Sequence, residues 1–199
     1  MKKLLCFGDS NTYGYDPRSY IGERYPADVR WTGLLGSSYT VLNAGQNGRG
    51  IPRRAAETSA VRDLLEQERP DVTLVMLGTN DLLQTPGFTA AGTAERMERF
   101  LRPLLDVPCG SRFLLIAPPP MVPGAWVTEP RLTEQSALLG ECYRALAQRL
   151  GISFADAGAW GVELLFDGVH FSPAGHRAFA AGVAGALAEL FWLPRCPVI

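Results

Sequence analysis

The sequence predicts an α/β fold with a mostly parallel sheet. Short apolar runs alternate along the chain with longer stretches in which apolar residues recur at helical spacing. The run at residues 72–77 is almost continuously apolar, which is typical of a central strand covered by helices on both faces. Several runs end in a polar block, and open parallel sheets bind their ligands at the carboxyl ends of their strands.

The first predicted strand covers residues 2–7 and ends at Gly8, Asp9 and Ser10. Glycine allows a sharp turn and a close approach by a substrate, so Ser10 is a candidate nucleophile at the sheet edge. The alternative is that this block is an ordinary polar turn. A nucleophilic serine also needs a base, an orienting acid and oxyanion donors from elsewhere in the chain.

The next elements are a loop, a strand and a helix. Residues 15–33 are rich in Pro, Arg, Tyr and Gly, and we expect a long surface loop there. The β-branched and aromatic run at residues 39–42 predicts the second strand, which leads into the glycine-rich block at residues 43–50. Residues 51–69 predict a helix, because apolar residues recur at helical spacing and Pro70 stops it.

The middle of the chain continues the alternation. The third strand, at residues 72–77, ends in a further polar block at residues 78–81. Amphipathic periodicity predicts a helix at residues 93–105, and the apolar run at residues 113–117 predicts the fourth strand. The prolines at residues 118–120 end that strand, because proline lacks the N–H that a strand ladder requires.

The clearest helix is predicted at residues 131–150, followed by a short fifth strand at residues 152–155. A last helix begins after Ser172, which suits the N-cap position because proline follows it. His176 falls within this helix, and we expect it to be a surface or cap residue. No linker or internal repeat interrupts the chain, so we expect a single domain over residues 1–199.

Composition excludes several classes of protein. The net charge is −1 and no block of like charge occurs, which argues against a nucleic-acid partner. The four cysteines form no CxxC pair, so we expect no zinc cluster and free thiols at Cys6, Cys109, Cys142 and Cys196. The N-terminal apolar run is too short for a signal peptide, and no apolar stretch approaches the roughly 20 residues that span a bilayer. We therefore expect a cytoplasmic protein with no membrane partner.

The other parts of a serine hydrolase site are present. His170 follows Asp167 in a predicted loop, and a carboxylate at this spacing can fix the imidazole tautomer and support the imidazolium. Oxyanion donors are available from the Ser10 N–H, a glycine N–H at residues 45–50 and the Asn80 amide. Each residue taken singly has an alternative interpretation. For His170 it is an exposed loop histidine, for Asp167 an ordinary loop carboxylate, and for Asn80 an Asx turn.

Together these polar blocks resemble the SGNH, or GDSL, hydrolase superfamily. The resemblance rests on four blocks that stand in the family's order: Phe7-Gly8-Asp9-Ser10, Asn43-Ala44-Gly45-Gln46-Asn47-Gly48, Gly78-Thr79-Asn80-Asp81 and Asp167-Gly168-Val169-His170. Each block lies at the end of a predicted strand or follows one. One such block is a weak signal, whereas four blocks in order form a strong one.

The resemblance implies a flavodoxin-like three-layer α/β/α sandwich with a five-stranded parallel sheet in the order 2-1-3-4-5. It implies Ser10 as the nucleophile, His170 as the base and Asp167 as the partner of that base. It also implies an oxyanion hole made of the backbone N–H groups of Ser10 and Gly48 and the side chain of Asn80. No metal or organic cofactor is implied.

Two positions depart from the family's usual pattern. Asn11 stands where many members have Leu or Ile. In the second block, residues 46–50 are Gln-Asn-Gly-Arg-Gly, whereas Ser-Gly-x-Thr is commoner in the family. Gly45 and Gly48 therefore both remain candidates for the oxyanion N–H, and we favour Gly48. The stretch at residues 29–33 is similar to a bacterial branch of arylesterases and acetyl esterases. That branch includes oligomers and acyl-transferring members, so a homo-oligomer is one expectation.

We therefore predict a serine esterase that hydrolyses small acyl esters, with acetyl as the expected acyl group and a small-molecule ester as its partner. The candidate substrate-binding residues lie on the edge loops: Asp9, Asn11, Tyr13, Trp31, Trp126, Val169 and Phe171. For Trp126 the alternative is a loop anchor or a subunit contact. For Trp31 the alternative is burial that stabilises the long loop.

Two other functions stay open at this point. A thioesterase or lysophospholipase on longer acyl chains would use the same residues, and acyl-chain preference separates it from an acetyl esterase. A non-catalytic module that binds carbohydrate or a nucleotide would use the same sheet edge. However, the glycine-rich loop lacks the GxxxxGK[ST] and GxGxxG patterns of phosphate binding, and a binding module has no need of a serine, a histidine and an aspartate together.

Overall fold

A parallel sheet organises the molecule. The computed structural model describes residues 1–19 and 21–192, and Cys196 lies outside them. The sheet has five strands in the order β2-β1-β3-β4-β5, and every neighbouring pair is parallel. The strands are β1 (Lys3–Gly8), β2 (Thr40–Gly45), β3 (Val72–Met76), β4 (Arg112–Ala117) and β5 (Ser153–Asp156). Cys6, Cys109 and Cys142 are free thiols.

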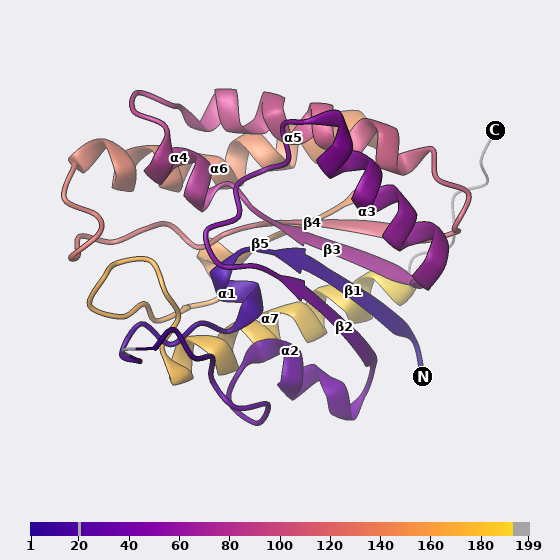
Figure 1. Cartoon of the computed structure of the whole chain (residues 1–199), viewed down its shortest axis with the longest axis horizontal. Helices are drawn as coiled ribbons and strands as arrows, with labels where there is room; N and C mark the ends of the chain where they lie inside the picture. The colour runs from indigo at the N-terminus through magenta and orange to yellow at the C-terminus, as the bar shows by residue number, and fades with distance from the viewer. Residues whose placement is uncertain (20, 193–199) are drawn as a thin grey trace.

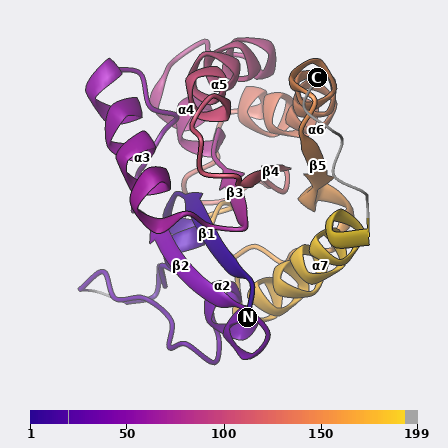
Figure 2. The ribbon, with the colours of Figure 1, turned by 90° about the vertical axis from the view of Figure 1, so that its right-hand side faces the viewer.

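Helices cover both faces of the sheet (Figures 1 and 2). One face carries α3 (Ala55–Glu68), α4 (Thr79–Gln84), α5 (Ala90–Leu105) and α6 (Pro130–Leu150). The other carries α2 (Trp31–Leu34), the 3₁₀ turn η1 (Leu35–Ser37) and α7 (Pro173–Trp192), while α1 (Ser10–Tyr13) lies at the end of β1 and η2 (Ala157–Ala159) follows β5. Within the described ranges, none of these helices has the length and apolar character needed to cross a membrane.

Each face of the sheet has its own hydrophobic core. Leu5 and Phe7 of β1 point into the core shared with α3, α5 and α6. Leu4 and Cys6 point into the core shared with α2 and α7. Successive side chains of a strand enter opposite faces, so a strand covered on both faces is apolar throughout. The predicted α/β/α layers and the strand order 2-1-3-4-5 are confirmed.

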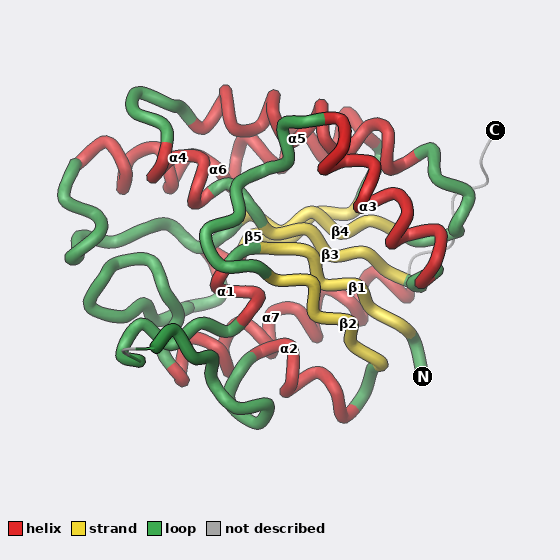
Figure 3. The backbone as a smooth tube through the Cα atoms, in the orientation of Figure 1, coloured by secondary structure: helices red, strands yellow, loops and turns green. Residues whose placement is uncertain are grey.

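The carboxyl ends of three neighbouring strands, β2, β1 and β3, lie level with each other. In the sheet register Gly8 pairs with Gly45 of β2 and with Met76 of β3. The polar blocks that follow these strands therefore share one edge of the sheet, at the left of Figure 3, where the loops gather. The loop from β5 to α7 reaches the same edge, because its His170 contacts Ser10.

Two short helices stand where turns are expected. Ser10 begins α1, which is four residues long, and Thr79 begins α4, which is six residues long. Helices of this length contain too few residues to show a helical period in the sequence. Helix α1 carries Ser10 and helix α4 carries Asn80, both at the edge of the sheet. A helical backbone fixes the direction of such a side chain better than an open loop would.

Helix α3 begins at Ala55, four residues later than the sequence pattern suggests. The Ile51 N–H donates to Asp81 Oδ2 at 2.9 Å, so this segment is tied to α4 instead of to a helical turn. The Glu57 carboxylate then accepts the Arg53 N–H at 2.9 Å, which closes the N-terminus of the helix. A buried carboxylate from another element thus sets the boundary of the helix.

Candidate active site

Ser10 is held at the first residue of α1, directly beyond the end of β1. The Asp9 carboxylate accepts the Asn11 N–H at 2.9 Å and caps this short helix. Gly8 permits the close approach of helix and strand, because a Cβ there would lie 2.1 Å from Thr12 Oγ1. The backbone that carries Ser10 is therefore fixed by its immediate neighbours.

Ser10, His170 and Asp167 form a hydrogen-bonded chain between two loops that are far apart in the sequence. Ser10 Oγ lies 2.9 Å from His170 Nε2, and His170 Nδ1 lies 2.7 Å from Asp167 Oδ2. All three side chains are buried, and Ser10 is the most exposed of them at 5%. A hydroxyl beside an imidazole that a carboxylate orients can lose its proton to that imidazole.

Asp167 is ionised at neutral pH although its side chain is fully buried. Burial opposes the charge, but three hydrogen bonds outweigh it and lower the pKa of Asp167. One comes from the His170 ring, and the backbone N–H groups of Val169 and His170 each donate to Oδ1 at 2.9 Å. The carboxylate thereby keeps a proton on His170 Nδ1 and leaves Nε2 as an acceptor that faces Ser10.

Asn11 joins the helix of the candidate nucleophile to the histidine loop. Its amide nitrogen donates to the Val169 carbonyl at 3.0 Å, and its Oδ1 accepts the Phe171 N–H at 3.0 Å. Asn11 directly follows Ser10 and its two partners flank His170, so these bonds set the separation of nucleophile and base. A Leu or Ile at this position makes neither bond, which gives the departure at Asn11 a physical meaning.

Gln84 connects two residues that are predicted to stabilise an oxyanion. Its Nε2 donates to the Gly48 carbonyl at 3.0 Å and to Asn80 Oδ1 at 3.2 Å. Asn80 Nδ2 in turn donates to the Arg49 carbonyl at 3.1 Å. The amide of Asn80 is therefore oriented at both ends, and one of its two N–H bonds remains for another acceptor.

Gly45 and Gly48 have different surroundings. The Gly45 N–H donates to Asn43 Oδ1 at 2.9 Å, and a Cβ on Gly45 would lie 2.1 Å from the backbone nitrogen of Tyr13. Gly45 thus serves the contact between β2 and α1. The Gly48 N–H makes no hydrogen bond with any residue that the structure describes. Of the two glycines, Gly48 has the N–H that is free to bind a ligand.

Arg49 secures this glycine-rich loop to the sheet. Its guanidinium donates to the Gly8 carbonyl at 3.0 Å, to Gln46 Oε1 at 2.8 Å and to the Ala44 carbonyl. It also lies over the Phe7 ring, 4.3 Å from the ring centroid. Nothing in the sequence pattern signals this role, because an arginine among glycines and asparagines resembles any exposed cation.

Two aromatic rings stand against the His170 imidazole. The ring centroids of Tyr15 and Trp126 lie 4.8 Å and 4.9 Å from that of His170, both in edge-on geometry. Trp126 is 52% exposed, so its outer side faces solvent beside the triad. Trp126 is among the residues expected near a substrate, whereas Tyr15 is not, because it belongs to the irregular loop whose path the sequence does not reveal.

The chain matches a known family over most of its length. The model of the GDSL-like Lipase/Acylhydrolase family matches residues 6–178, a range that contains Ser10, Asn80, Asp167 and His170. The chain belongs to this family. The resemblance seen in the polar blocks is therefore confirmed.

Proteins similar to this GDSL hydrolase carry related names. The chain is 28% identical to a carbohydrate acetylesterase from Sinorhizobium meliloti, with a TM-score of 0.84 and coverage of 96% of this chain and 100% of that one. It is 29% identical to an aryl esterase from M. smegmatis, with a TM-score of 0.80 and coverage of 97% and 100%. It is 27% identical over 213 residues to an acetylxylan esterase from Xylanibacter ruminicola. That match covers 93% of this chain but only 43% of the relative, so this chain spans less than half the length of that protein.

Trp31 and Phe171 are core residues of this GDSL hydrolase, and their contact with substrate stays a prediction. Trp31 is 1% exposed, packs 4.9 Å from the Phe179 ring, and donates Nε1–H to the Asn11 carbonyl at 2.9 Å. Phe171 is fully buried in the same core. For Trp31 the alternative, an anchor for the long loop, is what the structure shows.

The other candidate substrate residues make internal contacts. Asp9, Asn11 and Val169 are buried, and their polar groups take part in the hydrogen bonds described above. Burial raises the pKa of Asp9 to about 6, against the opposing effect of the Asn11 N–H. Tyr13 is half-buried, and the Arg24 guanidinium lies 4.9 Å from its ring centroid. Substrate contact by these four residues stays a prediction.

His176 is a fully buried residue of α7, so the expected surface or cap position is wrong. Its Nδ1 accepts the Trp31 N–H at 3.4 Å, and its ring packs edge-on against Phe171. Burial lowers the pKa of His176 to about 4. The helical spacing of His176, Phe179 and Val183 is the signal in the sequence that places them on one inward face.

The buried His176 makes the stability of the enzyme sensitive to acid. Its pKa is lower in the folded chain than the ordinary value of 6.5, so the stability present above that value is lost as the pH falls toward about 4. Between about pH 7.5 and about pH 5 we expect the wild type to lose about 2 kcal/mol more than His176→Asn, whose amide accepts the Trp31 N–H without titrating.

Urea unfolding of both proteins at the two pH values measures this difference. Asp9 titrates in the same range but is present in both proteins, so its contribution cancels. Equal losses of stability in the two proteins would show that His176 binds no extra proton on unfolding.

Proposed function

We propose that this chain is a serine esterase that hydrolyses small acyl esters, acetyl esters above all, through a Ser10–His170–Asp167 triad and an acyl-enzyme. One observation carries the proposal: Ser10 Oγ, His170 and Asp167 are linked by hydrogen bonds of 2.9 Å and 2.7 Å in a buried site. Membership of the GDSL-like acylhydrolase family supports it.

The geometry supports a two-stage reaction. Ser10 Oγ attacks the ester carbonyl carbon while His170 Nε2 takes the hydroxyl proton, and the ionised Asp167 stabilises the imidazolium. The tetrahedral intermediate then breaks its bond to the alcohol oxygen, which leaves with the proton from Nε2. Water attacks the acyl-enzyme and gives a proton to the same nitrogen. Release of the acid returns that proton to Ser10 Oγ.

The negative oxygen of the tetrahedral intermediate needs fixed donors. In this proposal they are the backbone N–H groups of Ser10 and Gly48 and the second N–H of the Asn80 amide. The free N–H of Gly48 and the engaged N–H of Gly45 support this choice. The bonds from Gln84 to Gly48 and Asn80 hold two of the donors before substrate arrives.

Gln84→Ala is expected to lower kcat by about tenfold with little change in KM, because it frees two donors that act on the transition state. Steady-state hydrolysis of p-nitrophenyl acetate measures both constants. Gln67→Ala, at an exposed position of α3, is the matched control and is expected to behave as the wild type. A rise in KM at unchanged kcat would place Gln84 in ground-state binding instead.

The preference for acetyl is supported by the relatives named carbohydrate acetylesterase and acetylxylan esterase. The rings of Tyr15 and Trp126 beside His170 are consistent with a site bordered by rigid side chains. A series of p-nitrophenyl acetate, butyrate and octanoate tests acyl size. The acetate is expected to have the highest kcat/KM, whereas the highest value for octanoate would favour the longer-chain thioesterase or lysophospholipase.

An acyl-enzyme trapped on Ser10 would test the mechanism directly. Wild-type protein is mixed with p-nitrophenyl acetate, quenched in acid within the first turnovers and digested for peptide mass analysis. We expect one acetyl group on the peptide that contains Ser10 and a burst of p-nitrophenol. Acetylation confined to other residues, together with steady hydrolysis, would rule out Ser10 as the nucleophile.

A further inference from the structure

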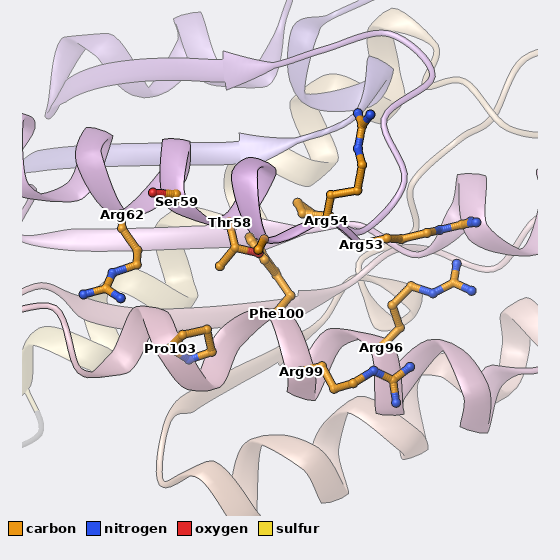
Figure 4. A pocket seen from close by; sticks show the side chains of 11 residues that line it. Arg53, Arg54, Thr58, Ser59, Arg62, Arg96, Arg99, Phe100 and Pro103 are labelled. Carbon is orange, nitrogen blue, oxygen red and sulfur yellow. The ribbon is translucent and has the colours of Figure 1, made fainter.

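A hollow of the surface lies between α3 and α5, and arginines dominate its walls (Figure 4). Its volume is about 590 Å³, and no residue of the triad lines it. The five arginines are Arg53, Arg54, Arg62, Arg96 and Arg99, and no acidic side chain is among the lining residues. We call it the arginine pocket. Neither the proposed esterase reaction nor the family blocks account for it.

Three of these arginines have carboxylate partners that are not among the residues lining the pocket. Arg54 pairs with Glu57 at 2.6 Å, and Arg96 pairs with Asp81 at 2.5 Å. Arg53 also lies 3.9 Å from Asp81. Two carboxylates therefore face three guanidinium groups, so the paired part of the pocket already carries an excess of positive charge.

The other two arginines add to this excess. Arg62 and Arg99 are exposed and make no ion pair with any residue that the structure describes. Thr58 and Ser59, in the N-terminal half of α3, add hydroxyl groups to the lining. The amino end of a helix carries a partial positive charge, so α3 strengthens the same field. Like charges gathered in a concavity repel one another and attract a counter-ion.

We propose that the arginine pocket binds a small molecule that carries a diphosphate group, at a site separate from the triad. Guanidinium groups bind phosphate oxygens through paired N–H donors, and arginine is the side chain best suited to this geometry. A single carboxylate would occupy one or two of the arginines, whereas a diphosphate is multiply charged and has oxygens for several.

The shape of the pocket favours a small ligand over a nucleic acid. Its volume falls within the roughly 300–1,000 Å³ of small-molecule sites, and Figure 4 shows Arg53, Arg96 and Arg99 at one end with Arg62 at the other. The whole chain has a net charge of −1, so no extended basic face accompanies the pocket. An adjoining hollow of about 670 Å³ shares Arg53 and Arg54 with the pocket and gives the rest of the ligand room.

Titration calorimetry with inorganic pyrophosphate tests the proposal, in about 0.15 M salt to screen weak surface attraction. The wild type is expected to bind it saturably at one site. Arg62→Ala/Arg99→Ala is expected to weaken binding at least about tenfold, because two phosphate-binding guanidinium groups are lost. A Gln pair at the same positions, which keeps long polar side chains, is expected to show the same loss.

Matched controls separate a built site from general charge. Arg144→Ala/Arg177→Ala removes the same charge from exposed positions on α6 and α7 and is expected to bind within about twofold of the wild type. Ser10→Ala is expected to bind pyrophosphate normally, and Arg62→Ala/Arg99→Ala to hydrolyse p-nitrophenyl acetate normally. Binding therefore tests this site even if the proposed esterase function fails.

Three results would overturn the proposal. The first is the absence of saturable pyrophosphate binding to the wild type. The second is equal weakening in the two double-alanine variants, which would reduce the effect to net charge. The third is loss of binding in Ser10→Ala, which would place the anion at the triad instead of at the arginine pocket.

Discussion

Ser10→Ala is expected to lower kcat for p-nitrophenyl acetate by at least about 10³-fold. The variant lacks the oxygen that forms the acyl-enzyme, and the residual rate comes only from the oxyanion donors and from substrate binding. The fold is expected to survive, because the hydroxyl's one hydrogen bond among the described residues goes to His170 Nε2, at 2.9 Å. The loss is therefore expected in catalysis and not in stability.

Ser38→Ala, at an exposed position after η1, is the matched control for this variant and is expected to keep full activity. Urea unfolding of both variants checks that each remains folded. If Ser10→Ala and the wild type hydrolyse the ester at the same slow rate, Ser10 is not the nucleophile. The alternative of a non-catalytic binding module would then become the better account of the site.

Asp167→Asn is expected to lower kcat by about 10³- to 10⁴-fold with little change in KM. Asp167 Oδ1 accepts two backbone N–H groups, from Val169 and His170, and Oδ2 accepts His170 Nδ1–H. An asparagine keeps its oxygen on the backbone donors and turns its NH₂ group toward Nδ1. Nδ1 must then accept, so the proton moves to Nε2 and faces Ser10. A protonated Nε2 cannot remove the hydroxyl proton.

The control for this prediction is Asp28→Asn, which makes the same change at an exposed position of the long loop. The folded chain lowers the pKa of Asp167, so its ionised form also contributes stability above the ordinary carboxyl pKa of about 3.9, and that contribution is lost as the pH falls toward the folded value. Urea unfolding at neutral pH is thus expected to show a less stable variant. A kcat within about tenfold of the wild type would show that control of the tautomer is not needed.

Local patterns were sufficient for much of the fold. The observed bounds of β3, α5 and α6 are close to the predicted ones. The apolar run of β3 and the amphipathic periods of the two helices are local properties of the sequence, so they can be recognised without the tertiary structure. Boundaries that depend on distant partners were less predictable. The start of α3 is set by Asp81, which belongs to α4 and follows Ile51 by 30 positions in the sequence. The helices α1 and α4 are too short to show a helical period in the sequence.

The sequence by itself determined the family and the candidate reacting residues of this protein. Ser10, Asp167 and His170 each stand in a polar block after a strand, and parallel strands bring such blocks to one edge whatever the details of packing. The prediction that these residues act together therefore depends on two things: the parallel topology of the sheet and the chemistry of the residues in each short motif.

Only the tertiary structure decided how the site is held and what else the surface offers. Asn11 and Val169 are 158 positions apart, and Gln84 lies 36 positions from Gly48, so no local pattern relates them. Burial decided that Trp31 and His176 belong to the core, and packing of α3 against α5 brought five arginines around one pocket. Hydrogen bonds, burial and charge clusters depend on distances between segments that are remote in the sequence, and those distances exist only once the sheet and its helices have packed.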